Sequence, residues 1–131
     1  MARVRIEDAV GLAAGDVVHK RFSALPASAT VRDVRAWFAA SSHRRMAFLA
    51  DEGRYVGSLT REDLAGDIDA DRAAAQLSHN GPVIAPDAPA SVGHQLALST
   101  DALRVPVVDH DGTLLGVIGV TDDLEAFCGA G

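Results

Sequence analysis

Short apolar runs, separated by polar segments that contain glycine, recur along this chain of 131 residues. Two pairs of runs each flank a turn rich in Asp, Glu or Gly: 46–50 with 55–60, and 105–108 with 114–118. Apolar runs of this length on either side of turn residues predict paired β-strands. The pattern therefore indicates two hairpins.

A helical stretch is expected before each hairpin, over 30–42 and over 89–100. In the first stretch the apolar side chains from Val31 through Val34 to Phe38 recur at helical spacing, which predicts one inward face. Thr30 suits the N-cap position of this helix because its hydroxyl can accept a hydrogen bond from a free backbone N–H.

Each half also begins with a short extended segment and ends with a short helix. The extended segments end near Leu25 and Ile84, and the final helices are expected to start near Thr60 and Thr121. The order β-α-β-β-α therefore occurs twice. The fold class is α/β (α+β), with two repeats packed on each other in pseudo-twofold symmetry, since one repeat of this size is marginal alone.

The two halves are copies of one pattern, which appears when the sequence is shifted by 59 residues. No gap is needed, and the identical pairs include Arg45 with Arg104, Gly53 with Gly112, Gly57 with Gly116, and Asp63 with Asp122. The predicted organisation is a lead-in segment over 1–15, a first repeat over 16–68 and a second repeat over 75–127, together forming one module.

Composition restricts the function classes. Apolar residues make up 48% and charged residues 23% of the chain, as in ordinary globular domains. The net charge of −6 argues against a nucleic-acid partner. No apolar run is long enough for a membrane span, and the N-terminus lacks a signal-peptide core, so a cytoplasmic location is expected. The five histidines show no ligand spacing, so no metal site is expected.

The segment DHDGTLL after the second apolar run invites an enzymatic interpretation. Apolar residues followed by Asp109 and Asp111 resemble the start of the active site of haloacid dehalogenase-like phosphatases, which implies a nucleophile and an acid/base. The first repeat places Ala50 and Glu52 at these positions. A hairpin turn explains both copies, since Asp and Gly favour turns. The phosphatase remains a remote alternative, and no enzyme is expected.

The repeat resembles a tandem pair of CBS (cystathionine beta-synthase) domains, a Bateman module. The resemblance is carried by RVPVVDHDGTLLGVIGVTD and its partner RMAFLADEGRYVGSLTRED, and it covers about residues 16–127. It implies a regulatory module that binds AMP, ADP, ATP or S-adenosylmethionine in the cleft between the repeats. It also implies a homodimer that signals in trans to an unknown protein target, with no obligatory cofactor.

The resemblance also implies which residues hold the ligand. Gly57, Thr60 and Asp63 match the family's ribose-phosphate pattern of Gly, two residues, Ser or Thr, two residues and Asp. A carboxylate accepts both ribose hydroxyls, and a hydroxyl beside a helix start suits phosphate. Thr60 and Asp63 also form a capping pattern, and the two interpretations are compatible. Arg45 and Arg104 are candidates for phosphate charge.

The second repeat departs from this pattern. Gly119 replaces the hydroxyl residue, whereas Asp122 keeps the ribose position and Thr121 suits an N-cap. The two clefts are therefore expected to be unequal. The resemblance places adenine among apolar residues of the first two strands of each repeat: Leu25, Pro26, Met46 and Ala47 in the first, and Ile84, Val105 and Pro106 in the second.

Two functions from different classes remain. The first is a non-catalytic module that senses adenosine nucleotides. The second is a ligand-free dimerisation or docking module that has kept the fold and lost the site. Gly119 and Ala47 favour the second function, whereas Thr60 and Asp63 favour the first.

Overall fold

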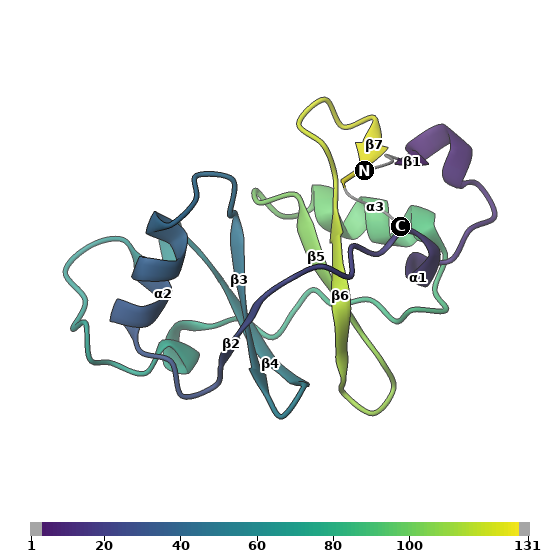
Figure 1. Ribbon diagram of the computed structural model, residues 1–131. Coiled ribbons are helices and arrows are strands. Elements are labelled where there is room, and N and C mark those ends of the chain that lie inside the picture. The colour runs from purple at the N-terminus through teal and green to yellow at the C-terminus, as the bar shows by residue number, and fades with distance from the viewer. Residues whose placement is uncertain (1–3, 129–131) are drawn as a thin grey trace. The chain divides into compact units, whose positions relative to one another are not determined.

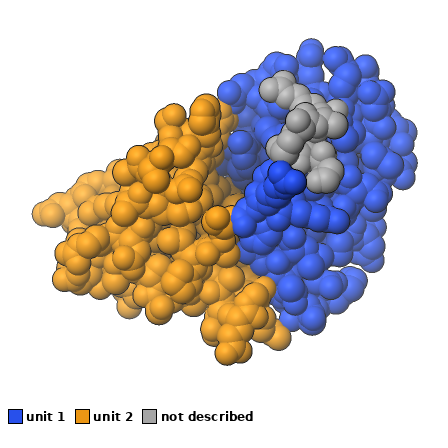
Figure 2. Space-filling model, viewed as in Figure 1, with its two compact units in different colours: residues 1–22, 82–131 blue, residues 23–81 orange. Residues whose placement is uncertain are grey.

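The computed structural model describes residues 4–128, which belong to two compact units. Unit 1 contains residues 1–22 and 82–131, and unit 2 contains residues 23–81 (Figure 2). Each unit combines short strands with short helices (Figure 1). The predicted α+β fold class is confirmed.

Unit 2 contains a three-stranded sheet in the order β2-β3-β4. β2 (Ala24–Pro26) runs parallel to β3 (Met46–Asp51), which forms an antiparallel hairpin with β4 (Arg54–Thr60). The helix α2 (Val31–Ala39) is three residues shorter at its C-terminal end than the stretch 30–42. Two short 3-10 helices, η2 (Glu62–Leu64) and η3 (Ala74–Leu77), follow the hairpin.

The regularly spaced apolar side chains of α2 pack into the core of unit 2, as predicted. Val31, Val34 and Phe38 are buried in one cluster with Leu49 of β3 and Leu59 of β4. Thr30 caps the helix: its Oγ1 accepts a hydrogen bond from the Asp33 N–H (3.2 Å), and the Asp33 carboxylate accepts one from the Thr30 N–H (3.0 Å). This pair of bonds satisfies donors that a helix start leaves free.

Unit 1 repeats this arrangement with a smaller central sheet. β5 (Arg104–Val108) and β6 (Leu114–Gly119) form an antiparallel hairpin, and Ile84 bridges in parallel to β5 at Val107. The helix α3 spans Ala90–Leu98. The N-terminal part of the chain adds β1 (Val4–Arg5), η1 (Ile6–Ala9) and α1 (Ala14–Val17), and β1 pairs with β7 (Ala126–Phe127).

Two segments, here called the crossing segments, pack on the hairpins: the one around His19 on the hairpin of unit 1, and the one around His79 on the hairpin of unit 2. In unit 1, His19 exchanges backbone hydrogen bonds with Val117 of β6 (2.8 and 3.1 Å). In unit 2, His79 does the same with Ser58 of β4 (2.9 Å each way). The described part of the lead-in expected over 1–15, from Val4 on, lies in the unit that contains the second repeat. The boundaries predicted for the repeats themselves stay a prediction.

These crossings explain the glycine pair that reveals the repeat. A Cβ at Gly116 would lie 2.6 Å from the carbonyl oxygen of His19, and one at Gly57 would lie 2.9 Å from the Cβ of Ser78. Both glycines are therefore required by the close passage of the crossing segment. Gly53 and Gly112 serve the hairpin turns instead, with φ of +83° and +90°.

The gapless alignment of the two repeats is wrong by one residue at the first hairpin strand. Met46 pairs with Thr60 in unit 2, but the equivalent pair in unit 1 is Arg104 with Gly119. Arg104 therefore takes the structural place of Met46, not that of Arg45. The cause is a compensating change: unit 1 has one residue fewer before β5 and one more in its turn, where Asp109 bonds to Thr113 (2.9 Å).

The short final helices are also largely absent. Directly after Thr60 the chain forms only the three-residue η2, and residues 122–125 form a turn that leads into β7. Leu124 has a φ of +65°, which is incompatible with a continuing helix. The Oγ1 of Thr121 accepts a hydrogen bond from the Ala126 N–H (3.2 Å), so this threonine closes the turn that leads into β7.

Candidate functional site: the Thr60–Asp63 turn

Thr60 ends β4, and the next three residues turn the chain so that Asp63 faces back toward it. The Thr60 N–H donates to Oδ2 of Asp63 (2.7 Å), and the Thr60 hydroxyl donates to the same oxygen (3.2 Å). The bond from the Thr60 N–H to the carboxylate repeats the one between Thr30 and Asp33, but η2 is too short to act as a helix with an N-terminal anion site. The predicted contact between the Thr60 hydroxyl and a phosphate would require that hydroxyl to leave Asp63.

The other oxygen of Asp63 contacts His79, which lies on the crossing segment. Nε2 of His79 and Oδ1 of Asp63 are 2.9 Å apart. Burial by itself raises the pKa of Asp63, but the hydrogen bonds from the Thr60 N–H and from His79 outweigh it and hold the pKa below its ordinary value of 3.8. Asp63 is therefore an ionised acceptor at neutral pH, with a side chain only 21% exposed.

Arg61 fixes this turn to the end of α2. Its Nη2 donates to the carbonyl oxygens of Phe38 (2.9 Å) and Ser41 (2.8 Å), and its Nε donates to that of Arg44 (3.2 Å). The guanidinium also lies 4.9 Å from the centre of the Phe38 ring. Phe38 belongs to the last turn of α2, whose carbonyl oxygens lack partners within the helix, so Arg61 adds a donor there. Its bonds to Ser41 and Arg44, just beyond α2, help to hold the turn that carries Asp63.

The predicted adenine residues of unit 2 do not gather at this turn. Met46 pairs with Thr60 and lies at the same end of the sheet, and Arg45 directly precedes it. Leu25 and Pro26 pair instead with Leu49 and Ala50, toward the other end of β3. The structure thus brings Arg45 and Met46 to the Thr60 end of the sheet and leaves the two β2 residues away from it.

Several of the predicted adenine residues form the cores of the two units. Ala47 belongs to the core of unit 2, Ile84 and Val105 belong to that of unit 1, and Pro106 is fully buried. This packing accounts for their apolar character without a ligand. Their predicted role in binding adenine stays a prediction.

Unit 1 has Gly119 where unit 2 has Thr60, and the Arg104 side chain occupies the space that a threonine side chain would need. The Arg104 side chain lies over Gly119, so that a Cβ on Gly119 would meet its Cδ and Nε at 3.0 Å. Nη1 of Arg104 donates to the carbonyl oxygens of Leu103 (3.0 Å) and Val120 (3.3 Å). Asp122 is exposed on the following turn. The expected inequality of the two repeats therefore has a structural basis in Arg104.

The two aspartates of DHDGTLL bond to their own loop. Oδ1 of Asp109 accepts from the His110 N–H (2.8 Å), and Oδ1 of Asp111 accepts from the Thr113 N–H (3.1 Å). Such bonds between Asp side chains and nearby backbone stabilise turns. The loop is thus explained as the turn between β5 and β6.

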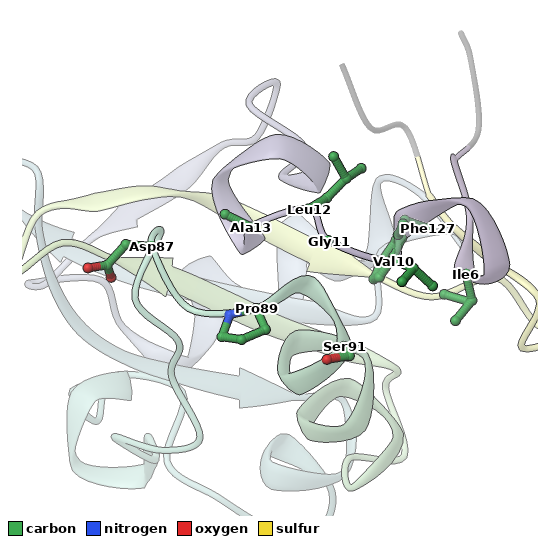
Figure 3. A pocket seen from close by; sticks show the side chains of 10 residues that line it. Ile6, Val10, Gly11, Leu12, Ala13, Asp87, Pro89, Ser91 and Phe127 are labelled. Atoms are coloured by element: carbon green, nitrogen blue, oxygen red, sulfur yellow. The ribbon is translucent and has the colours of Figure 1, made fainter.

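A cavity of about 440 Å³ lies in unit 1, and none of the predicted site residues lines it (Figure 3). Its lining is mostly apolar, with Ile6 at one end and Asp87 at the other. A smaller cavity of about 190 Å³ lies beside the Thr60–Asp63 turn and is lined by Arg35, Phe38, Ala39, Arg61 and Leu64. Among residues 4–128, no cluster of three or more potential metal ligands occurs.

Sequence reasoning missed His79 and Arg61. His79 lies 16 residues after Asp63, at no spacing that a motif would single out. A signal was nevertheless present, because His19 and His79 recur 60 residues apart in the two segments that cross onto the hairpins. Arg61 stands inside the T-R-E-D capping pattern, and only the fold brings it to the end of α2.

Residues 74–122 match the model of the CBS domain family. Solved structures extend the likeness across most of the chain. CBSX2 from Arabidopsis thaliana shares 21% identity at a TM-score of 0.70, with 83% of this chain and 89% of that chain covered. The chain has the fold of a CBS pair. The resemblance inferred from the repeat is thereby confirmed.

Two further CBS-pair structures show the same fold. PAE2072 from Pyrobaculum aerophilum, complexed with AMP, shares 22% identity at a TM-score of 0.70, covering 82% of this chain and 87% of that one. The CBS pair of the putative Mg²⁺ transporter SO5017 from Shewanella oneidensis shares 18% identity at a TM-score of 0.69. The match covers 78% of this chain but only 61% of the SO5017 chain.

CBSX2 has also been solved in complex with AMP; that match has a TM-score of 0.69 and covers 87% of this chain and 93% of that chain. No curated protein sequence is significantly similar to this chain. Within residues 4–128, no helix combines the length and the apolar character that crossing a membrane requires.

Proposed function

We propose that this CBS pair is a non-catalytic regulatory module that binds an adenosine-containing nucleotide through unit 2. Asp63 carries the proposal, because it is an ionised and largely shielded carboxylate at the end of β4, and such a group suits the paired hydroxyls of a ribose. CBSX2 and PAE2072, which share the fold, are complexed with AMP. AMP is therefore the first ligand to test, followed by ADP, ATP and S-adenosylmethionine.

Arg45 supplies positive charge for the phosphate in this proposal, since it precedes Met46 at the Thr60 end of the sheet. Unit 1 contributes less, because the Arg104 side chain fills the place of the hydroxyl. The packing of Arg104 at Gly119 also favours the second candidate function, a ligand-free dimerisation or docking module, if unit 2 binds no nucleotide. Homodimerisation, a protein target in trans and a cytoplasmic location are further parts of the proposal.

Thermal unfolding of the full chain with each compound tests binding. A ligand at a hundred times its dissociation constant should stabilise the protein by about 2.7 kcal/mol. Asp63→Asn should abolish this shift, whereas Asp67→Asn, a change at an exposed carboxylate of the same unit, should retain it. If none of the four compounds shifts the unfolding of the wild-type protein, the docking module replaces the sensor.

A further inference from the structure

The chain itself already occupies most of the acceptor capacity of Asp63. Oδ2 accepts from the N–H and the hydroxyl of Thr60, and Oδ1 accepts from Nε2 of His79. A carboxylate offers about four lone-pair positions. A ribose presents two neighbouring hydroxyl donors, so it requires a position that one of these groups now fills.

His79 is the donor that can leave at least cost. The Thr60 N–H belongs to the main chain at the end of β4, and it holds the turn closed. The His79 side chain is 64% exposed, whereas that of Asp63 is 21% exposed. Two backbone hydrogen bonds to Ser58 fix the main chain of His79, so its ring can rotate toward water while the crossing segment stays in place. Water then satisfies the released imidazole.

The geometry points to His79 as a competitor of the ligand for Oδ1 of Asp63, which makes nucleotide affinity depend on pH. This inference rests on the proposed function of Asp63. Because an ionised carboxylate only accepts hydrogen bonds, Nε2 of His79 carries the proton in this contact. When the ring gains its second proton the bond becomes charge-assisted, and such bonds are markedly stronger than neutral ones. Acidification therefore strengthens the competitor and weakens ligand binding.

Asp63 is the charged group that contacts His79 directly. Two hydroxyls reach the His79 carbonyl oxygen, those of Tyr55 (3.3 Å) and Ser58 (3.4 Å), both from β4. Burial raises the pKa of Tyr55 above its ordinary value of 10.0, so this hydroxyl stays neutral between pH 5 and 8. The neighbouring Asn80 amide donates to the Val56 carbonyl oxygen and carries no charge. Over this range Asp63 stays ionised, because its pKa lies below its ordinary value of 3.8.

Adenosine is the appropriate probe, because it lacks the phosphate that would itself titrate. Isothermal titration calorimetry on the full chain should show adenosine affinity falling about two- to fivefold between about pH 8 and about pH 5, the range expected for a partly exposed ion pair. His79→Ala should bind more tightly than the wild-type protein at the lower pH and show no such fall. His79→Gln retains an uncharged donor, so it should remove the pH dependence without a large gain in affinity.

His110→Ala is the matched control, because His110 is also exposed and contacts a carboxylate, that of Asp87 in unit 1 (3.6 Å). It should leave the pH dependence unchanged. Adenosine binding that depends neither on pH nor on His79 contradicts the competition alone and leaves the nucleotide site standing. If the wild-type chain binds neither adenosine nor AMP at either pH, the proposed function fails and the competition fails with it.

Discussion

The side chain of Arg104 covers the α-carbon of Gly119, which is the backbone position that Thr60 holds in the other unit. A Cβ at Gly119 would lie 3.0 Å from two atoms of this arginine, and Nη1 of Arg104 is tied to backbone carbonyl oxygens. The glycine and the arginine thus depend on each other. The missing hydroxyl of the second repeat is the consequence of that packing.

Gly119→Thr should therefore lower the free energy of unfolding by about 1 to 2 kcal/mol, the usual cost of overfilling a packed site. In the double variant Arg104→Met with Gly119→Thr, which copies the Met46–Thr60 pair, most of this loss should disappear. Urea unfolding of the two single variants and the double variant measures the coupling between the sites. Additive effects of the two changes would contradict the mutual dependence.

The crossing segment predicts the effect of a single methyl group at Gly57. Gly57→Ala should destabilise the protein by about 1 to 3 kcal/mol, because its Cβ would lie 2.9 Å from the Cβ of Ser78 and closer still to the hydroxyl. Gly81→Ala is the control, since no atom lies within 4 Å of a Cβ built there. If the two variants have equal unfolding midpoints in urea, the crossing segment at Ser78 does not lie as close to Gly57 as it does in the structure.

Arg61→Ala should destabilise unit 2 and weaken nucleotide binding together. The change leaves the carbonyl oxygens of Phe38 and Ser41 without the guanidinium and releases the turn that holds Asp63. We expect a loss of about 1 to 2 kcal/mol in unfolding free energy. Arg61→Lys should restore little, because an ammonium group cannot reproduce the planar fork of donors. Full stability in the lysine variant, measured by thermal unfolding, would show that only the charge matters.

Acid should weaken the fold partly through Asp63. Its pKa is lower in the folded chain than its ordinary value of 3.8, because hydrogen bonds from Thr60 and His79 outweigh burial. The stability that this carboxylate contributes is therefore present above pH 3.8 and is lost as the pH falls through the lower folded value. The stability difference between the wild-type protein and Asp63→Asn should accordingly shrink in acid.

Urea unfolding at neutral pH and in acid measures this effect, with Asp67→Asn as the exposed control. A stability difference between the wild-type protein and Asp63→Asn that is the same at both values would mean that the hydrogen bonds to Asp63 contribute nothing to folding.

Local patterns predicted the hairpins, the helices α2 and α3 and the α2 core, because apolar spacing and turn glycines act over short distances. The Thr30 cap and the turn at Gly53 could be predicted for the same reason. The one-residue offset that pairs Arg104 with Gly119 could not be predicted from the sequence. The missing residue before β5 and the extra residue in the turn cancel each other in a gapless alignment. The expected helix after Thr121 failed because β7 pairs with β1, which lies at the far end of the chain.

The residues of the candidate site also fall into those that local sequence patterns predict and those that only the fold brings together. Thr60 and Asp63 could be chosen from their spacing, and the structure does bring them into contact. Leu25 and Pro26 were expected near them but lie along the other part of β3. His79 reaches Asp63 only through the crossing segment, a contact over a long sequence separation that local patterns do not report. The hydrogen bonding of Asp63 therefore depends on a residue that only the fold could reveal.

Calorimetric titration of AMP into the wild-type chain, Asp63→Asn and Asp122→Asn tests the central claim most directly, because it compares the same residue of the two repeats. The account predicts one AMP per wild-type chain, loss of that binding in Asp63→Asn and its retention in Asp122→Asn. Retained binding in Asp63→Asn, or its loss in Asp122→Asn alone, would contradict the assignment of the nucleotide site to unit 2.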